Sequence, residues 1–141
     1  MTTYTNKVTW EGDHLGHTYC ENGTDMQFSA PPTLHGHPGM MTPEDALVMA
    51  VNTCYQMMII WAAERFKLDL VAYESSAVGE IEEFLDQTSW FKKITLKPKI
   101  TVRSSSEPVV NRAMQLAYKY STIAQSFKGD VVIEPEIVII G

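Results

Sequence analysis

Residues 42–67, TPEDALVMAVNTCYQMMIIWAAERFK, decide the fold because they predict one long buried helix over about 43–67. Thr42 is a good N-cap, Pro43 suits the first helical position, and Glu44 and Asp45 complement the positive end of the helix dipole. Apolar side chains cover the segment nearly all round, so we expect it to be buried on several sides. One small domain can hardly supply that cover, and we therefore predict a homodimer formed through this helix.

The same segment raises the question of a membrane span. Residues 46–63 are apolar over a sufficient length, but Asn52, Thr53 and Gln56 lie in the middle and the ends lack basic anchors. We expect a buried helix of a soluble protein and no membrane partner. Residues 1–12 hold no apolar run typical of a signal peptide, and two cysteines are too few for a disulfide framework. These features predict a cytoplasmic protein with reduced thiols.

Composition excludes several classes of function. The net charge is −6, and the scattered lysines and arginines form no basic run, which argues against a nucleic-acid partner. Lys7 is the only lysine or arginine before Arg65, so the N-terminal part has almost no permanent cation. The sequence contains no glycine-rich phosphate loop, CxxC, HExxH or nucleophile elbow, and we expect no cofactor.

Strand patterns lie on both sides of the helix. Residues 1–30 predict an antiparallel meander with turns at Gly12-Asp13 and Asn22-Gly23. Residues 70–141 predict a β-β-α-β unit whose second strand alternates cleanly between apolar and polar side chains. We expect one α+β domain over 1–141, with antiparallel sheets around a buried central helix.

Three details of the C-terminal part are specific enough to test. Residues 80–90 are acidic and predict a turn or loop. Pro98, inside the alternating strand, predicts an edge position or a bulge, because proline cannot donate to a ladder hydrogen bond. A helix is expected after Ser106, followed by a short helical turn and one last strand over 131–140.

Three segments carry a family resemblance. They are Trp10-Glu11-Gly12-Asp13, then Thr42-Pro43-Glu44-Asp45-Ala46-Leu47 continuing to Val51-Asn52-Thr53-Cys54, and Ala117-Tyr118-Lys119-Tyr120-Ser121-Thr122-Ile123. In this order, and with this succession of elements, the chain resembles the OsmC/Ohr family of osmotically inducible and organic hydroperoxide resistance proteins. The resemblance implies an intertwined homodimer with the two cysteine helices at its centre. It also implies an apolar pocket at the dimer interface that accepts organic hydroperoxides.

The resemblance assigns roles to three residues. It implies that Cys54 is the peroxidatic nucleophile and that Glu44 orients an activating arginine from the N-terminal half. Ser121 stands where the family has a second cysteine, which forms a disulfide with the first. This chain therefore lacks the second cysteine, and it has no arginine before Arg65. Both departures are typical of a divergent OsmC-like member.

Cys54 has two interpretations. A nucleophilic cysteine needs a cation, because only the thiolate is reactive, and a free cysteine is also a common inert core residue. Candidate cations are the four histidines, three arginines and a partner subunit's side chain; the residues are His14, His17, His35, His37, Arg65, Arg103 and Arg112. Cys20 or an external thiol would have to resolve an oxidised Cys54. The histidines fix no third metal ligand by their spacing, so we interpret them as surface residues and expect no metal site.

Two functions therefore remain open. The first is a one-cysteine, thiol-dependent reductase of organic hydroperoxides, with Cys54 as nucleophile, Glu44 as orienting acid and an external thiol as reductant. The second is a non-catalytic protein that binds a small apolar ligand in the same pocket. The missing cysteine and arginine favour the second function, whereas the family spacing of Glu44 and Cys54 favours the first.

Overall fold

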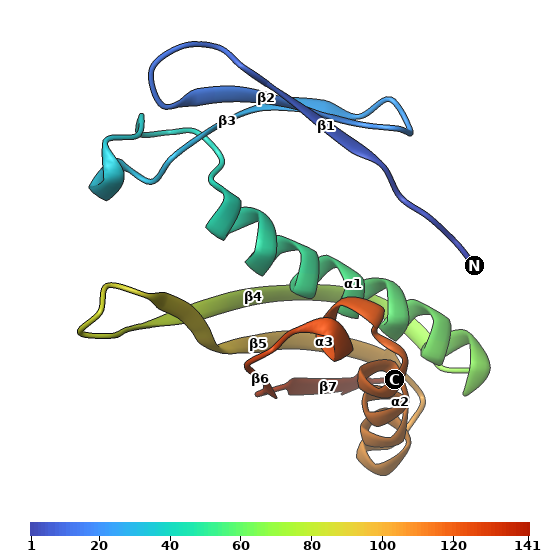
Figure 1. Ribbon diagram of the computed structural model, residues 1–141. Helices are drawn as coiled ribbons and strands as arrows, with labels where there is room; N and C mark the ends of the chain where they lie inside the picture. The colour runs from blue at the N-terminus through green and yellow to red at the C-terminus, as the bar shows by residue number, and fades with distance from the viewer. The chain divides into compact units, whose positions relative to one another are not determined.

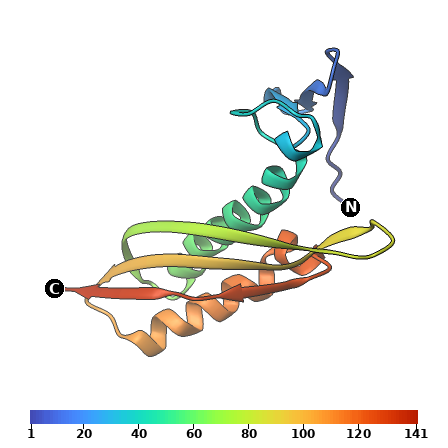
Figure 2. The ribbon, with the colours of Figure 1, turned by 90° about the vertical axis from the view of Figure 1, so that its left-hand side faces the viewer.

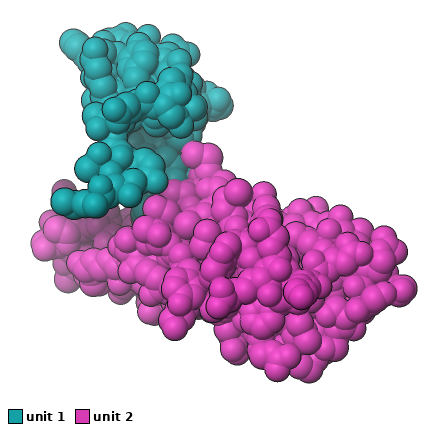
Figure 3. Space-filling view, turned by 90° about the vertical axis from the view of Figure 1, so that its right-hand side faces the viewer, with its two compact units in different colours: residues 1–47 teal, residues 48–141 magenta.

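The computed structural model describes residues 1–141 and contains seven strands, three α-helices and one short 3-10 helix (Figure 1). In chain order the elements are β1 (Asn6–Trp10), β2 (Leu15–Cys20), β3 (Asp25–Ser29), η1 (Pro32–Leu34), α1 (Pro43–Arg65), β4 (Asp69–Glu83), β5 (Ser89–Arg103), α2 (Glu107–Tyr120), α3 (Thr122–Ser126), β6 (Asp130–Ile133) and β7 (Glu136–Ile140). By its contacts the chain divides into two compact units, residues 1–47 and 48–141, which Figure 3 colours separately. The single domain over 1–141 stays a prediction.

The first unit is the predicted meander, and both of its turns form. Strands β1, β2 and β3 pair in that order, each antiparallel to the next. Gly12 and Gly23 occupy the turns with φ of +88° and +97°, a backbone conformation that glycine adopts without strain. The side chains of Val8, Trp10 and Met26 lie on one face of this sheet, and they are 60%, 79% and 38% exposed. One face of this sheet is therefore apolar.

The start of α1 is capped as the sequence predicts. The Asp45 amide donates to the Thr42 hydroxyl at 3.1 Å, and the Thr42 amide donates back to the Asp45 carboxylate at 3.1 Å. The Thr42 hydroxyl also donates to that carboxylate at 2.8 Å. This reciprocal capping box satisfies amides that the first helical turn leaves free. The helix ends at Arg65, two residues before the expected limit.

The second unit contains a four-stranded sheet with β5 as its central strand. Strand β4 pairs antiparallel with β5, and Figure 2 shows the two as a long hairpin. Strands β6 and β7 pair with β5 on its other side, and both run parallel to it. The expectation of purely antiparallel sheets is therefore wrong for this sheet, which is mixed. The reason is α2, because a crossover helix after β5 brings the chain back in the same direction.

Pro98 does not lie on an edge strand, so that prediction is wrong. It lies in the centre of β5, buried and opposite Ser75 of β4, and neither register shift of the β4–β5 pair falls there. On the other side of β5, β6 pairs with residues 93–96 and β7 with residues 99–103. The missing N–H of Pro98 thus falls in the gap between β6 and β7. The expected single last strand is split at the same place.

The β4–β5 turn is shorter than expected. Strand β4 continues through the acidic residues to Glu83, and β5 begins at Ser89, so the turn occupies only 84–88. Glu80 and Lys93 pair across the hairpin at 3.4 Å between the carboxylate and the ammonium group. Acidic residues alternate with apolar ones here, and the cross-strand lysine offsets their charge.

The core of the second unit lies between the sheet and the helices. Ile94, Leu96, Ile100 and Val102 of β5 are buried, as the alternation predicts, and they share one cluster with residues of α1 and α2. The α1 contribution is Val51, Tyr55, Ile59 and Ala62. Helix α1 is the one helix long and apolar enough to cross a membrane, but this buried face is what a core helix of a soluble protein shows. Met49, Met57 and Trp61, away from that face, are 47%, 55% and 36% exposed.

Candidate functional site

Cys54 and Ser121 lie in direct contact in the second unit. Cys54 is half-buried in the fourth turn of α1, and Ser121 is fully buried between α2 and α3. The Ser121 hydroxyl donates a hydrogen bond to the Cys54 sulfur over 3.2 Å. The structure therefore brings together the expected nucleophile and the residue at the position of the second cysteine, which are 67 residues apart in the chain.

Ser121 also has a structural role that its sequence position does not reveal. Its hydroxyl accepts a hydrogen bond from the Ala124 amide at 3.5 Å, so Ser121 is the N-cap of α3. The same oxygen therefore accepts from the backbone and donates to sulfur. A hydroxyl that donates to sulfur interacts more strongly with a thiolate than with a thiol, because charge-assisted hydrogen bonds are the stronger ones.

Glu44 is the second residue of α1 and belongs to the first unit. Its Oε1 atom is buried and has no hydrogen-bond partner. A buried carboxylate oxygen without a hydrogen-bond donor costs free energy. A cationic side chain beside Glu44 would remove this cost.

The candidate cations differ in their availability. His17 lies 2.7 Å from the Asp25 carboxylate, and His37 and His14 lie 3.0 Å and 3.9 Å from that of Asp13, so three of the four histidines are paired with acids. Arg103 pairs with Asp69 at 3.3 Å. Arg65 makes no salt bridge and lies on the same helix as Cys54. No group of three or more His, Cys, Asp or Glu side chains is placed to hold a metal ion.

The two cysteines lie in different units and neither is in a disulfide. Cys20, at the end of β2, is exposed, and its nearest polar contact is the Asn6 amide at 3.9 Å from its sulfur. The expected role of Cys20 as an alternative resolving thiol stays a prediction.

A separate set of polar groups is buried between α1 and β4. The Asn52 amide donates to the Ser75 carbonyl of β4 at 3.0 Å, while its Oδ1 atom and the Tyr73 hydroxyl are buried without partners. Burial raises the pKa of Tyr73 to about 12. Burial, and next the neighbouring Tyr73, also raise the pKa of Tyr55 well above its usual value. Both phenols are therefore neutral at any physiological pH.

A pocket of about 350 Å³ opens between α1 and α2, and sequence reasoning missed it as a single site. It is lined by Met58, Trp61, Arg65, Leu116 and Tyr120. The spacing of its α1 residues could have revealed it, because Cys54, Met58, Trp61 and Arg65 recur at four, three and four residues. This period places them in one stripe along a helix. The contribution of α2 depends on the tertiary fold and has no such signal.

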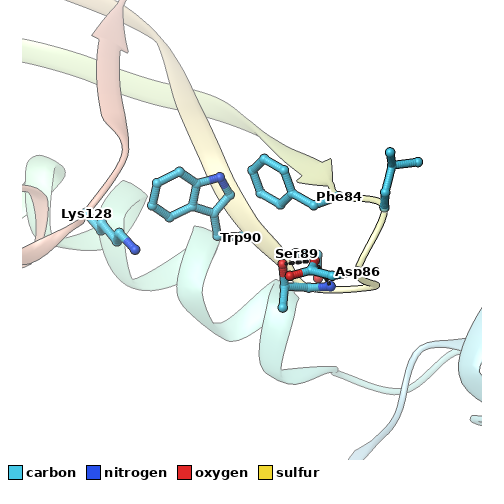
Figure 4. A pocket seen from close by; sticks show the side chains of 7 residues that line it. Phe84, Asp86, Ser89, Trp90 and Lys128 are labelled. Carbon is cyan, nitrogen blue, oxygen red and sulfur yellow. Dashed lines mark hydrogen bonds between the residues drawn. The ribbon is translucent and has the colours of Figure 1, made fainter.

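A larger pocket, of about 760 Å³, lies at the tip of the β4–β5 hairpin. Figure 4 shows the Trp90 ring between Phe84 and Lys128, whose ammonium lies 3.7 Å from the ring centroid. The Asp86 carboxylate accepts hydrogen bonds from the Thr88 hydroxyl at 2.6 Å and its amide at 3.1 Å, which lowers its pKa. The pocket contains none of the expected site residues.

Comparisons with known proteins identify the family and the fold. The family model described as OsmC-like protein matches residues 36–136. Among curated proteins, none matches the sequence. An OsmC-like protein of unknown function from Vibrio cholerae has a similar structure, with a TM-score of 0.86, 20% identity, and coverage of 96% of this chain and 99% of that one.

Two solved structures with functional names are also similar. An organic hydroperoxide resistance protein from Elizabethkingia anophelis has a TM-score of 0.77 at 14% identity, covering 98% of this chain and 96% of that one. An organic hydroperoxide resistance protein from Legionella pneumophila has a TM-score of 0.76 at 16% identity, with 98% of each chain covered. At these identities the likeness establishes the fold, and it confirms the expected α+β architecture.

Proposed function

This chain belongs to the OsmC-like protein family, and on that premise we propose that it reduces organic hydroperoxides through a one-cysteine cycle at Cys54. The observation that carries the proposal is the 3.2 Å hydrogen bond from Ser121 to the Cys54 sulfur. This hydrogen bond gives the Cys54 thiol a polar contact. Without it, the thiol would pack as an inert core group. The hydroperoxide resistance proteins with the same fold support the substrate class.

The proposed cycle has two steps. The Cys54 thiolate attacks the terminal oxygen of the hydroperoxide, so that an S–O bond forms while the O–O bond breaks, and the departing alkoxide takes up a proton to become the alcohol. This leaves Cys54 as a sulfenic acid. An external thiol then attacks the sulfenic sulfur, forming a mixed disulfide with Cys54 and releasing water. A second external thiol attacks the external sulfur of this mixed disulfide, so that a new S–S bond forms and the Cys54 thiolate leaves. Cys54 returns to its reduced state, and two thiols have been oxidised to one disulfide.

Ser121 and Glu44 have supporting roles in this cycle. Ser121 cannot form a disulfide, but its hydroxyl positions the sulfur and stabilises its negative charge. Glu44 is the orienting acid, and its unpartnered Oε1 favours a cation supplied by a second copy of the chain. The exposed side chains of Met49, Met57 and Trp61 support the homodimer that such a site requires. Dependence on an external thiol suits the reducing cytoplasm.

The decisive experiment is peroxide consumption by the reduced protein. Cumene hydroperoxide and hydrogen peroxide are the substrates, dithiothreitol and dihydrolipoamide the reductants, and Cys54→Ser is compared with wild type. Cys20→Ser is the matched control, since Cys20 is the only other thiol. We expect turnover of cumene hydroperoxide that is lost in Cys54→Ser and kept in Cys20→Ser. Absence of turnover, with Cys54 still unoxidised by mass spectrometry, would leave the second candidate function, binding of a small apolar ligand.

A further inference from the structure

The pocket at the tip of the β4–β5 hairpin lies outside the Cys54 site and has the composition of a ligand site. Its volume of about 760 Å³ is within the range of small-molecule sites. Phe84, Leu85 and Trp90 supply its apolar lining, and all three side chains are exposed. Asp86 and Lys128 are its only charged side chains, and their charges are of opposite sign. The pocket therefore combines an apolar surface with one acid and one base.

The apolar surface consists mainly of two aromatic rings. The ring centroids of Phe84 and Trp90 lie 6.0 Å apart, with an angle of 60° between the ring planes. Each of the two side chains is 42% exposed. A ligand side chain that covers both rings would remove apolar surface from water, which favours binding.

The two charges line one pocket without neutralising each other, since neither Asp86 nor Lys128 takes part in a salt bridge. The Lys128 ammonium is held 3.7 Å from the centroid of the Trp90 ring. The Oδ1 atom of Asp86 accepts hydrogen bonds from the Thr88 hydroxyl at 2.6 Å and the Thr88 amide at 3.1 Å. These bonds lower the pKa of Asp86, so the carboxylate is charged at physiological pH, and its Oδ2 atom receives no donor. Each charge is therefore positioned by the chain and free to pair with a ligand.

The separation of the charges sets the length of the ligand. Figure 4 shows Lys128 and Asp86 on opposite sides of the Trp90 ring. A ligand that reaches from the ammonium across both aromatic rings extends up to about 10 Å, the length of three residues of extended chain. A single amino acid carries both of its charges on one carbon and is too short to reach both ends.

We propose that this pocket binds a free peptide of about three residues, with its carboxylate on Lys128 and its ammonium on Asp86. The central side chain of the peptide is apolar and covers the Phe84 and Trp90 rings. This binding is separate from the peroxidase cycle, because none of the groups involved contacts Cys54.

NMR titration of the reduced protein with Ala-Phe-Ala tests the binding. The indole N–H signal of Trp90, assigned by its loss in Trp90→Phe, should shift, while the signals of Trp10 and Trp61 should stay in place. N-acetyl-Ala-Phe-Ala lacks the ammonium, and Ala-Phe-Ala-amide lacks the carboxylate. Each should bind about three- to fivefold more weakly than the free peptide, the range for an exposed ion pair.

Two variants assign each end of the peptide to its partner. Lys128→Gln should weaken the free and acetylated peptides about three- to fivefold and leave the amide unchanged. Asp86→Asn should weaken the free peptide and the amide equally and leave the acetylated peptide unchanged. Lys7→Gln, in the first unit, changes the net charge as Lys128→Gln does and should change no affinity. The unshifted indole signals of Trp10 and Trp61 show that each variant is folded.

Three results would overturn the proposal. The first is a Trp90 signal that does not move, and the second is a shift of Trp10 or Trp61 in its place. The third is equal binding of all three peptides, which would mean that the pocket recognises an apolar side chain alone, as in an internal segment of a partner protein. No peroxide is present in these titrations, so their outcome is independent of the proposed function.

Discussion

Removing the Ser121 hydroxyl should lower stability by a magnitude that follows from its two contacts. The substitution Ser121→Ala deletes the N-cap of α3, which typically contributes about 1 kcal/mol. The cap contact to Ala124 is 3.5 Å long, so a value of about 0.5 kcal/mol is more appropriate. The hydrogen bond to sulfur contributes about 0.5–1 kcal/mol more. Serine and alanine are similar in size, so no large cavity adds to the cost.

The expected loss of unfolding free energy is therefore about 1–1.5 kcal/mol, a fall in Tm of about 3–5 °C for a chain of this size. Denaturant unfolding of four proteins measures it: wild type, Ser121→Ala, Cys54→Ala and the double variant. Since both residues share one hydrogen bond, the Ser121→Ala cost should be about 0.5 kcal/mol smaller in the Cys54→Ala background.

Either of two results would refute this reasoning. An equal cost in both backgrounds means that the contact between the hydroxyl and the sulfur stabilises nothing. A total cost below about 0.3 kcal/mol means that Ser121 does not cap α3 either. Reaction of Cys54 with iodoacetamide gives an independent readout, because loss of a donor to the thiolate should slow alkylation several-fold at neutral pH.

Three further predictions rest on other contacts. Ser121→Cys should form a disulfide with Cys54 on mild oxidation, since the two side-chain atoms already lie 3.2 Å apart; free thiols that persist on non-reducing mass analysis would contradict this. Stability should fall from pH 10 towards pH 12, because burial raises the pKa of Tyr73 and of Tyr55, so that the unfolded chain loses these phenolic protons first; Tyr73→Phe should make the fall smaller in denaturant titrations, and Tyr55 should account for the rest. Light scattering at micromolar concentration should give a dimer, and Met57→Glu, which puts a charge on the exposed stripe of α1, should give a monomer with unchanged helix content.

The sequence was sufficient for the parts of the fold that local chemistry determines. The capping box at Thr42 and Asp45 and the glycine turns of the meander depend on residues within a few positions of one another. The buried face of β5 follows from alternation alone, because successive side chains of a strand point to opposite sides. Each of these predictions needed no knowledge of what packs against the segment.

The failures arose where the partner strand matters. Pro98 predicted an edge strand because a central proline loses a ladder hydrogen bond, but that argument assumes a continuous neighbour. Here the neighbour is interrupted, and β6 and β7 leave a gap opposite Pro98. The acidic residues up to Glu83 indicated a loop by composition, although the lysine across the hairpin lets them continue the strand. Neither compensation is visible within the segment itself.

In the candidate site, too, some features follow from the local sequence and others depend on tertiary contacts. The motif spacing identified Cys54 and Ser121, but the role of the serine depends on a contact between residues 67 positions apart. Serine keeps the cap of α3 and a polar contact to sulfur, so the local structure of the site does not need the second thiol. What the serine cannot supply is a covalent route from sulfenic acid to disulfide. Serine at position 121 therefore changes how a sulfenic acid at Cys54 could be resolved. It leaves the contact that positions the Cys54 sulfur in place. If Cys54 is oxidised, its sulfenic acid must be resolved by a thiol other than residue 121.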